Sequence, residues 1–230
     1  MHLTSADPAG IGRFLRFLDG QAGAASRLVI VGDLFDVWVT PAQAGDPGLA
    51  PVFESLSRLA ARIDVGFVEG NRDFAATSEL RSLGVRRLDD VIVVESGGRR
   101  VVATHGDLLC TKDVRYQAFR RIARTKTVRH LLRRAPSRAA RSVGSAARKG
   151  SAMETASKAH GDMGLAPLAV ESILRVHDAD ALVCGHVHWG QRFRMDVDGR
   201  ARDVVVLGAW ENRPNWAELT PEGLAFRTFE

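Results

Sequence analysis

Residues 28–36 read Leu28-Val29-Ile30-Val31-Gly32-Asp33-Leu34-Phe35-Asp36. The first four are apolar and mostly β-branched, which is typical of a short strand buried on both faces of a sheet. Gly32 then permits a turn, so the strand delivers the Asp33 side chain to the edge of the sheet. A carboxylate has two oxygens and can bridge two cations, and we interpret Asp33 as a bridging metal ligand. The alternative role is a cap on a following helix.

The same pattern occurs three more times along the chain. Apolar runs at 65–68, 101–104 and 181–184 lead directly into polar motifs. These motifs are Gly70-Asn71-Arg72-Asp73, His105-Gly106-Asp107 and Gly185-His186-Val187-His188. Ligands of open α/β sheets gather beyond the carboxyl ends of strands, so four such coincidences favour one shared site. A carboxylate, a carboxamide and three imidazoles suit manganese, zinc or iron better than calcium.

Each motif alone has an ordinary structural alternative. Residues 70–73 are typical of a turn, and a single histidine such as His105 is more often a core or surface residue. The pair His186 and His188 is the strongest single signal, because two imidazoles in one loop can reach adjacent metals. Arg72 matches the oxygens of a phosphate with two parallel hydrogen bonds. A surface salt bridge between Arg72 and Asp73 is the alternative for that residue.

The remaining pattern predicts a layered α/β domain. Further strands are predicted at 91–94 and 204–208, and Gly97-Gly98 connects the first of these to 101–104 as a hairpin. Helical periodicity is present at 11–18, 52–60 and 168–176. Strands that alternate with helices in this way indicate helices packed on sheets. The tryptophans Trp38, Trp189 and Trp210 are expected to pack in the core or at its rim, with stacking on a base as the alternative.

Residues 112–162 differ from the rest of the chain in charge. Between Asp113 and Glu154 there are twelve Lys or Arg and no acidic residue, so a net charge of +5 leaves −7 for the remainder. Apolar residues recur there at helical spacing, and a second segment, 138–158, has a weaker helical pattern. We predict a basic helical cap at 112–162 inserted between two parts of the α/β core, 1–111 and 163–230. Such a block implies an anionic partner, and its scarcity of aromatic residues disfavours nucleic acid.

Composition limits the size of the core and the cellular compartment in which we expect the protein. At 230 residues and 45% hydrophobic content the chain can bury one sizeable core. No stretch approaches the roughly 20 uninterrupted apolar residues of a membrane span, and the first residues lack a signal-peptide pattern, so we expect a cytosolic protein. Cys110 and Cys184 are far apart in the sequence, which favours reduced thiols in packing roles.

Together these motifs resemble the calcineurin-like metallophosphoesterases, and in detail the branch of that family that hydrolyses UDP-2,3-diacylglucosamine in lipid A synthesis. The resemblance covers nearly the whole chain. Three features separate this branch from generic phosphatases. They are Asn71-Arg72-Asp73, with Arg where the wider family has His, then Tyr116-Gln117-Ala118-Phe119-Arg120, and Leu207-Gly208-Ala209-Trp210. The resemblance implies a four-layer αββα sandwich with a helical cap.

The resemblance also implies a ligand set for two divalent metal ions, with manganese as the preferred choice. Metal one takes His2, Asp33 and His188. Metal two takes Asp33, Asn71, His105 and His186. The catalytic group is then Arg72, Asp33, Asn71 and His105. The substrate is expected to contact Asn71, Arg72, Asp113, Tyr116, Lys158 and His186.

One position departs from the family pattern. The family opens with a strand that ends in Asp-x-His, where both side chains bind the first metal. His2 matches the histidine, but the Asp position falls before Met1. We therefore expect the natural protein to begin several residues upstream of Met1.

The implied reaction is hydrolysis of the pyrophosphate of UDP-2,3-diacylglucosamine to UMP and 2,3-diacylglucosamine 1-phosphate. Its partners are the lipid-linked nucleotide and the anionic inner membrane, met through the basic cap on the cytoplasmic face, with no nucleic acid and no obligate protein partner. Apolar cap residues are expected to line an acyl-chain cleft or to pack on the body: Phe119, Ile122, Leu131 and Leu132. The alternatives are a metallophosphoesterase of a soluble nucleotide or phosphoprotein, and an inactive basic scaffold that binds membrane.

Overall fold

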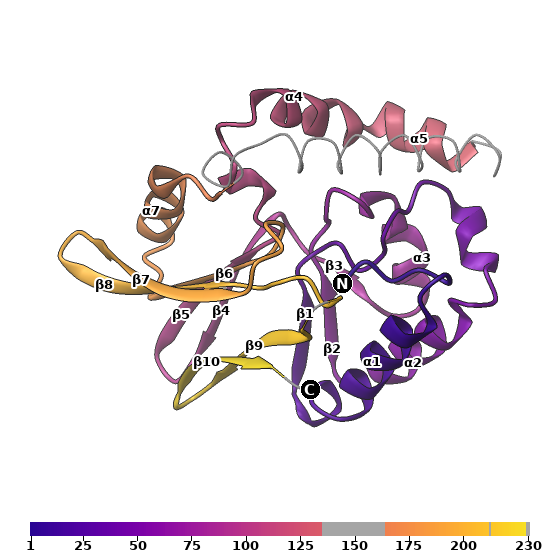
Figure 1. Ribbon diagram of the computed structural model, residues 1–230, viewed down its shortest axis with the longest axis horizontal. Coiled ribbons are helices and arrows are strands. Elements are labelled where there is room, and N and C mark those ends of the chain that lie inside the picture. Colours follow the sequence, from indigo (N-terminus) through magenta and orange to yellow (C-terminus); the bar gives the residue numbers. More distant parts are fainter. Residues whose placement is uncertain (135–163, 212, 229–230) are drawn as a thin grey trace. The chain divides into compact units, whose positions relative to one another are not determined.

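The computed structural model describes residues 1–134, 164–211 and 213–228 (Figure 1). The chain forms two compact units: Met1–Leu88 with Arg115–Lys158, here the first unit, and Asp89–Val114 with Ala159–Glu230, the second unit. Each unit has its own sheet, and the predicted α/β class is confirmed. The division into a core and a cap at 112–162 stays a prediction. The expected helical segment at 138–158 lies outside the described residues.

The first unit is built on a parallel sheet of β1 (Arg27–Ile30), β2 (Asp64–Phe67) and β3 (Arg86–Arg87). Helices α1 (Pro8–Asp19) and α2 (Ala50–Ala60) pack side by side, and α3 (Thr77–Ser82) precedes β3. Asp7 caps α1 by accepting a hydrogen bond from the Gly10 backbone at 2.9 Å, and Pro8 occupies the first turn, where its missing N–H costs nothing. The largest buried side chains of this unit are Phe14, Phe35, Trp38, Leu56 and Phe67.

The described part of the predicted cap is helical, as expected. It consists of α4 (Val114–Ala123) and α5 (Lys126–Arg134). Four large apolar side chains of these helices are exposed rather than packed on a core: Val114, Phe119, Ile122 and Leu131. In the part of the chain that the structure describes, no helix is both long and apolar enough to cross a membrane.

The second unit is built on a five-stranded sheet. Its order is β4 (Val91–Ser96), β5 (Arg99–Thr104), β6 (Ala181–Cys184), β8 (Arg200–Val206) and β7 (Gln191–Val197). The three central strands are parallel and the two outer strands antiparallel. Helix α7 (Pro167–Val176) places Val170 and Leu174 in the same apolar cluster as Leu182 and Val204. A hairpin of β9 (Asn215–Thr220) and β10 (Gly223–Thr228) completes the unit.

The predicted strands are all present, as are the helices predicted at 11–18, 52–60 and 168–176, with ends shifted by a few residues. The hairpin through Gly97 and Gly98 is confirmed, since β4 pairs antiparallel with β5. The four strands that precede the polar motifs belong to two sheets, however, because β1 and β2 lie in the first unit and β5 and β6 in the second. The sequence analysis missed β3, β7, β9 and β10.

The turn at Gly97 and Gly98 gives a matched test of this packing. Both residues have a positive φ, 56° and 74°, but a Cβ on Gly97 would lie 2.1 Å from the carbonyl oxygen of Pro221, whereas a Cβ on Gly98 would meet nothing within 4 Å. We expect G98A to cost about 1–2 kcal/mol through its left-handed backbone alone. G97A should cost roughly 1–3 kcal/mol more, because the β9–β10 turn must move. Urea unfolding of both variants measures this, and equal losses would contradict the described contact.

Candidate metal centre

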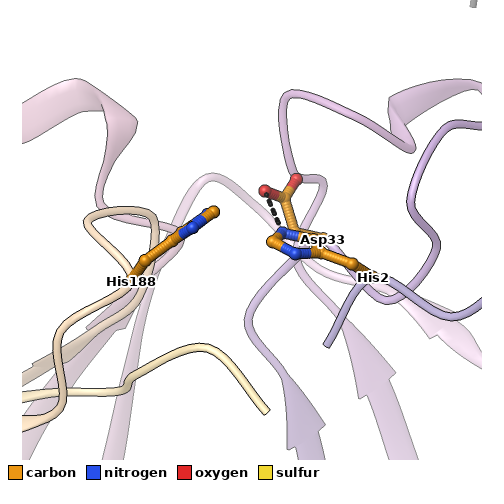
Figure 2. A group of neighbouring side chains, drawn as sticks. All are labelled: His2, Asp33 and His188. Atoms are coloured by element: carbon orange, nitrogen blue, oxygen red, sulfur yellow. Dashed lines mark ion pairs between the residues drawn. The ribbon is translucent and has the colours of Figure 1, made fainter. Parts of the chain in front are cut away.

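Asp33 stands at the end of β1 in a strained loop. Gly32 and Asp33 both have a positive φ, 82° and 51°, a conformation that L-residues with a Cβ avoid. The Asp33 carbonyl accepts hydrogen bonds from the backbone nitrogens of Met1 at 2.8 Å and His2 at 3.0 Å. This pairing brings the His2 imidazole to the buried Asp33 carboxylate, with Nε2 3.5 Å from Oδ2 (Figure 2). His2 and Asp33 therefore lie together, as the ligand assignment requires.

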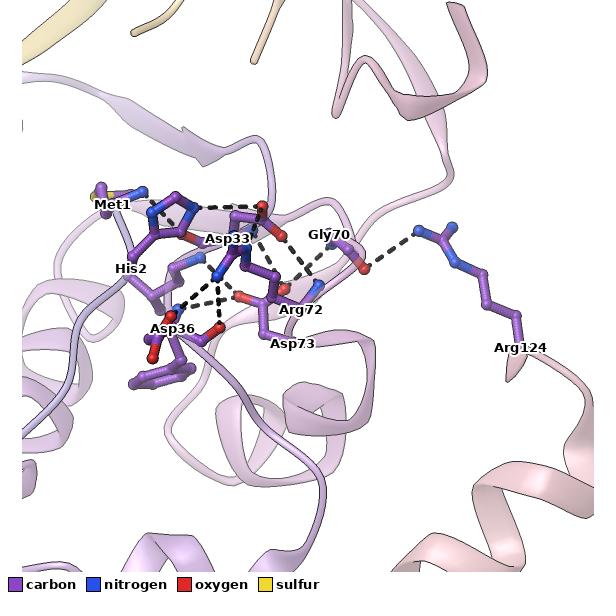
Figure 3. Close-up of polar contacts among 10 residues, drawn as sticks. Met1, His2, Asp33, Asp36, Gly70, Arg72, Asp73 and Arg124 are labelled. Carbon is purple, nitrogen blue, oxygen red and sulfur yellow. Dashed lines mark hydrogen bonds and ion pairs between the residues drawn. The ribbon is translucent and has the colours of Figure 1, made fainter. Parts of the chain in front are cut away.

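Asp73 holds two loops of the first unit together. Its fully buried carboxylate accepts hydrogen bonds from four backbone N–H groups, those of Asp33, Leu34 and Phe35 after β1 and that of Gly70 after β2, at 2.6–3.2 Å (Figure 3). The expected alternative of a surface salt bridge between Arg72 and Asp73 is wrong, because Asp73 is not at the surface. Sequence reasoning missed this role, although an aspartate three residues after a loop glycine is a common way to close a turn.

The loop of residues 69–73, here the Asn71 loop, lies directly against Asp33. The Arg72 backbone N–H donates to Asp33 Oδ1 at 3.1 Å, and the Arg72 guanidinium pairs with Asp36 Oδ1 at 3.0 Å. A Cβ on Gly70 would lie 2.3 Å from both the nitrogen and Oδ1 of Asp33. Only glycine permits this approach, and it brings the Arg72 backbone to the carboxylate of Asp33. The predicted site residues His2, Asp33 and Arg72 of the first unit thus lie together.

Glu69 begins this loop and is a further residue that sequence reasoning missed. Its carboxylate is 1% exposed and accepts hydrogen bonds from Thr77, Arg87 and Arg129. Burial by itself raises the pKa of Glu69, but the hydrogen bonds from Arg129, Thr77 and Arg87 outweigh it and bring the pKa down to about 2. Glu69 is therefore a buried anion at neutral pH, held by cationic side chains.

The second unit assembles its histidines at the ends of two neighbouring strands. His105 follows β5, and His186 and His188 follow β6. The Gly185 N–H donates to the His105 carbonyl at 2.9 Å, and a Cβ on Gly106 would lie 2.7 Å from the Gly185 carbonyl oxygen. The two loops are consequently in close contact. The His105 and His186 rings lie edge to face, with centroids 5.1 Å apart, and His105 is buried.

Positive φ angles concentrate on the predicted ligands. Six non-glycine residues of the described chain have a positive φ, and four of them are His2 (59°), Asp33 (51°), His186 (72°) and His188 (62°). The other two, Asp178 and Asp198, are aspartates, which adopt this conformation more readily. Each such residue costs on the order of 1–3 kcal/mol, and such strain persists mainly where function requires a particular side-chain placement.

Three further residues are predicted to contact the substrate. Asp113 and Tyr116 flank the start of α4 and are half-buried, and Lys158 lies outside the described residues.

Trp38 and Trp210 are buried, which supports packing roles, whereas Trp189 is 49% exposed. Both cysteines are buried, and neither forms a disulfide. Burial raises the pKa of the Cys184 thiol to about 12, so it is unsuited to act as a thiolate.

The side chains that could hold a divalent cation include His2 and Asp33 of the first unit and His105, His186 and His188 of the second. The donors are imidazole nitrogens and carboxylate oxygens, without sulfur. This mixed set suits first-row divalent metals, so the residues fit such an ion by the chemistry of their donors.

Comparison with known proteins agrees with this chemistry. The family model described as calcineurin-like phosphoesterase matches residues 1–190. UDP-2,3-diacylglucosamine hydrolase of Bordetella pertussis is 36% identical over 97% of this chain and 90% of that protein. The protein of that name in an Enterobacter strain is 33% identical over 100% of this chain and 96% of its own length, and that of Aeromonas hydrophila is 36% identical over 91% and 88%. Strand-end donors, loop geometry and full-length similarity agree, and the chain belongs to the calcineurin-like phosphoesterase family.

Proposed function

We propose that this protein hydrolyses the pyrophosphate bond of UDP-2,3-diacylglucosamine and releases UMP and 2,3-diacylglucosamine 1-phosphate, a step of lipid A synthesis. Relatives that carry the name of this activity match nearly the full chain at 33–36% identity. The observation that carries the proposal is the strained, positive-φ backbone at His2, Asp33, His186 and His188. Such strain is retained where a reaction needs these side chains in fixed positions.

The family uses divalent metal ions, and we infer which residues hold them here. His2, Asp33 and His188 would hold one ion, and Asp33, Asn71, His105 and His186 the other, with manganese preferred. When bound, two such cations supply Lewis acidity, activate a water molecule near neutral pH and neutralise charge on the substrate phosphate. The protein contributes the placement: Asp73 holds the loop of Asp33, and Gly185 and His105 hold the two histidine loops together.

We infer that Arg72 acts on the phosphate. Its backbone is fixed by the Asp33 carboxylate, and its guanidinium is oriented by Asp36 at 3.0 Å. The side chain of Arg72 is 17% exposed, so a substrate oxygen reaches it in a partly desolvated setting. A planar guanidinium held in this way stabilises the negative charge that accumulates on phosphate oxygens as the bond breaks.

We infer that the cap binds the acyl chains of the substrate and contacts the membrane surface. Phe119, Ile122 and Leu131 are 57%, 63% and 70% exposed, which is unusual for large apolar side chains on two adjacent helices. Such a surface suits acyl chains. The basic residues of the same segment would attract the anionic cytoplasmic face of the inner membrane, at about 1 kcal/mol for each residue near the surface.

The activity itself is tested with purified protein and UDP-2,3-diacylglucosamine in detergent micelles. With manganese present we expect release of UMP, followed by chromatography, and the lipid 1-phosphate, followed by ³¹P NMR. A chelator should abolish the reaction and added Mn²⁺ should restore it. The substitutions H186A and D33A should each abolish it as well, because the proposed ligand sets lose a member. Hydrolysis of soluble nucleotides or phosphopeptides without UMP release would contradict the proposed substrate.

Arg72 is tested by substitution with methionine and with lysine. We expect R72M to lower kcat by about 10²–10³-fold, the range seen when one transition-state donor is removed. R72K should recover only part of this loss, because an ammonium cannot reproduce the planar fork of a guanidinium. Steady-state UMP release at saturating Mn²⁺ measures both variants. An unchanged kcat in R72M would remove Arg72 from the reaction.

The cap surface is tested with the charged substitutions F119D, I122D and L131D. These side chains are exposed, so the free energy of unfolding should change by no more than about 0.5 kcal/mol. We expect binding to anionic vesicles to weaken and the KM for the diacylated substrate to rise. L168D is the matched control, because Leu168 is 79% exposed on α7, outside the cap. Equal effects of L168D and the cap variants would argue against a special role of this surface.

A further inference from the structure

Two arginines of the α4–α5 segment contact the backbone on both sides of Asn71 and Arg72. Arg124 follows α4, and its Nη2 donates to the carbonyl oxygen of Gly70 at 3.3 Å (Figure 3). The same Nη2 donates to the carbonyl oxygen of Glu69 at 3.0 Å. Arg129 lies in α5, and its Nη1 donates to the carbonyl of Phe74 at 3.2 Å. The segment thus touches the Asn71 loop where it begins and at the residue that follows it.

The contact with Glu69 is the strongest of these. Arg129 forms two charge-assisted hydrogen bonds to the Glu69 carboxylate, Nη1 to Oε1 at 2.7 Å and Nη2 to Oε2 at 2.5 Å. Arg87 and Thr77 both donate to Oε1, so Arg129 alone among these three satisfies Oε2. Leaving a buried carboxylate without such a partner is strongly unfavourable. Loss of Arg129 would therefore force the start of the Asn71 loop to rearrange toward water or another donor.

The two arginines are also linked to each other. The Nε of Arg129 donates to the Arg124 carbonyl at 3.2 Å, and the Arg129 guanidinium lies over the Phe74 ring, 5.6 Å from its centroid. One guanidinium therefore joins the carboxylate of Glu69, the carbonyl and ring of Phe74, and the backbone at the start of α5. A connected network of this kind responds as a unit when one member is removed.

We propose that Arg124 and Arg129 are positioning residues that hold the Asn71 loop, so that Asn71 and Arg72 are correctly oriented only when the α4–α5 segment is seated. This inference rests on the proposed function, in which Asn71 binds metal and Arg72 binds phosphate. It links the segment that would receive the lipid to the loop that would act on the phosphate. Displacement of a catalytic group by about 1 Å can cost up to roughly 10²-fold in rate, so the link has a measurable consequence.

The test compares R129M and R124M with the control R81M. Arg81 is an exposed arginine at the end of α3 in the same unit. We expect kcat for UMP release to fall by about tenfold or more in R129M and R124M, with KM changed much less. Amide hydrogen exchange in residues 70–74 should accelerate by a similar factor, because local opening of the loop becomes easier. R81M should change neither quantity.

A double substitution distinguishes positioning from direct contact with the substrate. If Arg129 acts through Glu69, E69Q should lower kcat by itself, and adding R129M should cause little further loss, since coupled residues are not additive. Independent, multiplying losses would mean that Arg129 contacts the substrate, and would overturn the proposal. R129K should be intermediate, because it retains the charge but not the two-pronged hydrogen bonding.

The positioning role can be tested even if the proposed substrate is wrong. Hydrogen exchange needs no substrate, and hydrolysis of bis(4-nitrophenyl) phosphate with Mn²⁺ gives a second rate. Faster loop exchange in R129M or R124M together with a slower diester reaction supports positioning, even if the wild-type protein releases no UMP. Unchanged exchange and unchanged rates in a folded variant overturn it. If R129M fails to fold, as judged by circular dichroism, R124M and R129K decide the question.

Discussion

The hydrogen bonds of the buried Asp73 carboxylate are the constraint on which the first unit's contribution to the site depends. Four backbone N–H groups from two separate loops point at one side chain. Without it these donors would be buried and unsatisfied, which is costly for each group. The strained conformation of Asp33, the close approach of Gly70 and the backbone contact of Arg72 all follow from this convergence. A neutral or shorter side chain at position 73 would leave at least part of the set unpaired.

The second unit brings its own candidate ligands together at the ends of two neighbouring parallel strands. Its histidine loops rest on backbone contact, since Gly185 donates to His105 and Ala209 donates to the carbonyl of His188 at 2.9 Å. Each loop continues directly from a central parallel strand, β5 or β6, so the sheet sets the starting direction of both. Gly106 allows the two loops to touch, because a Cβ at this position would lie 2.7 Å from the Gly185 carbonyl oxygen. The left-handed residues His186 and His188 are stabilised by this frame rather than by their own preference.

Much of this arrangement could be predicted from the sequence, because every candidate ligand except His2 follows a strand. That rule alone singles out Asp33, Asn71, His105 and His186 as candidate ligands. The rule cannot predict contacts between residues that are distant in sequence, and Arg129 is 60 residues from Glu69. Nor does it identify Asp73, whose partners are backbone groups that any sequence possesses. Strand β7 was missed for a different reason: its residues are mostly exposed and rich in arginine, so it lacks the apolar run on which strand prediction relies.

Strand β7 also affects how readily the protein associates with other copies of itself. β7 is an outer strand of the five-stranded sheet, and an outer strand offers unpaired backbone groups to which another chain can add. Arg192 and Arg194 project from it, and Asp203 of β8 accepts hydrogen bonds from both. Charged side chains on an outer strand disfavour its pairing with the same edge of a second molecule. A protein that displays apolar side chains elsewhere on its surface thereby retains a safeguard against fibrous self-association.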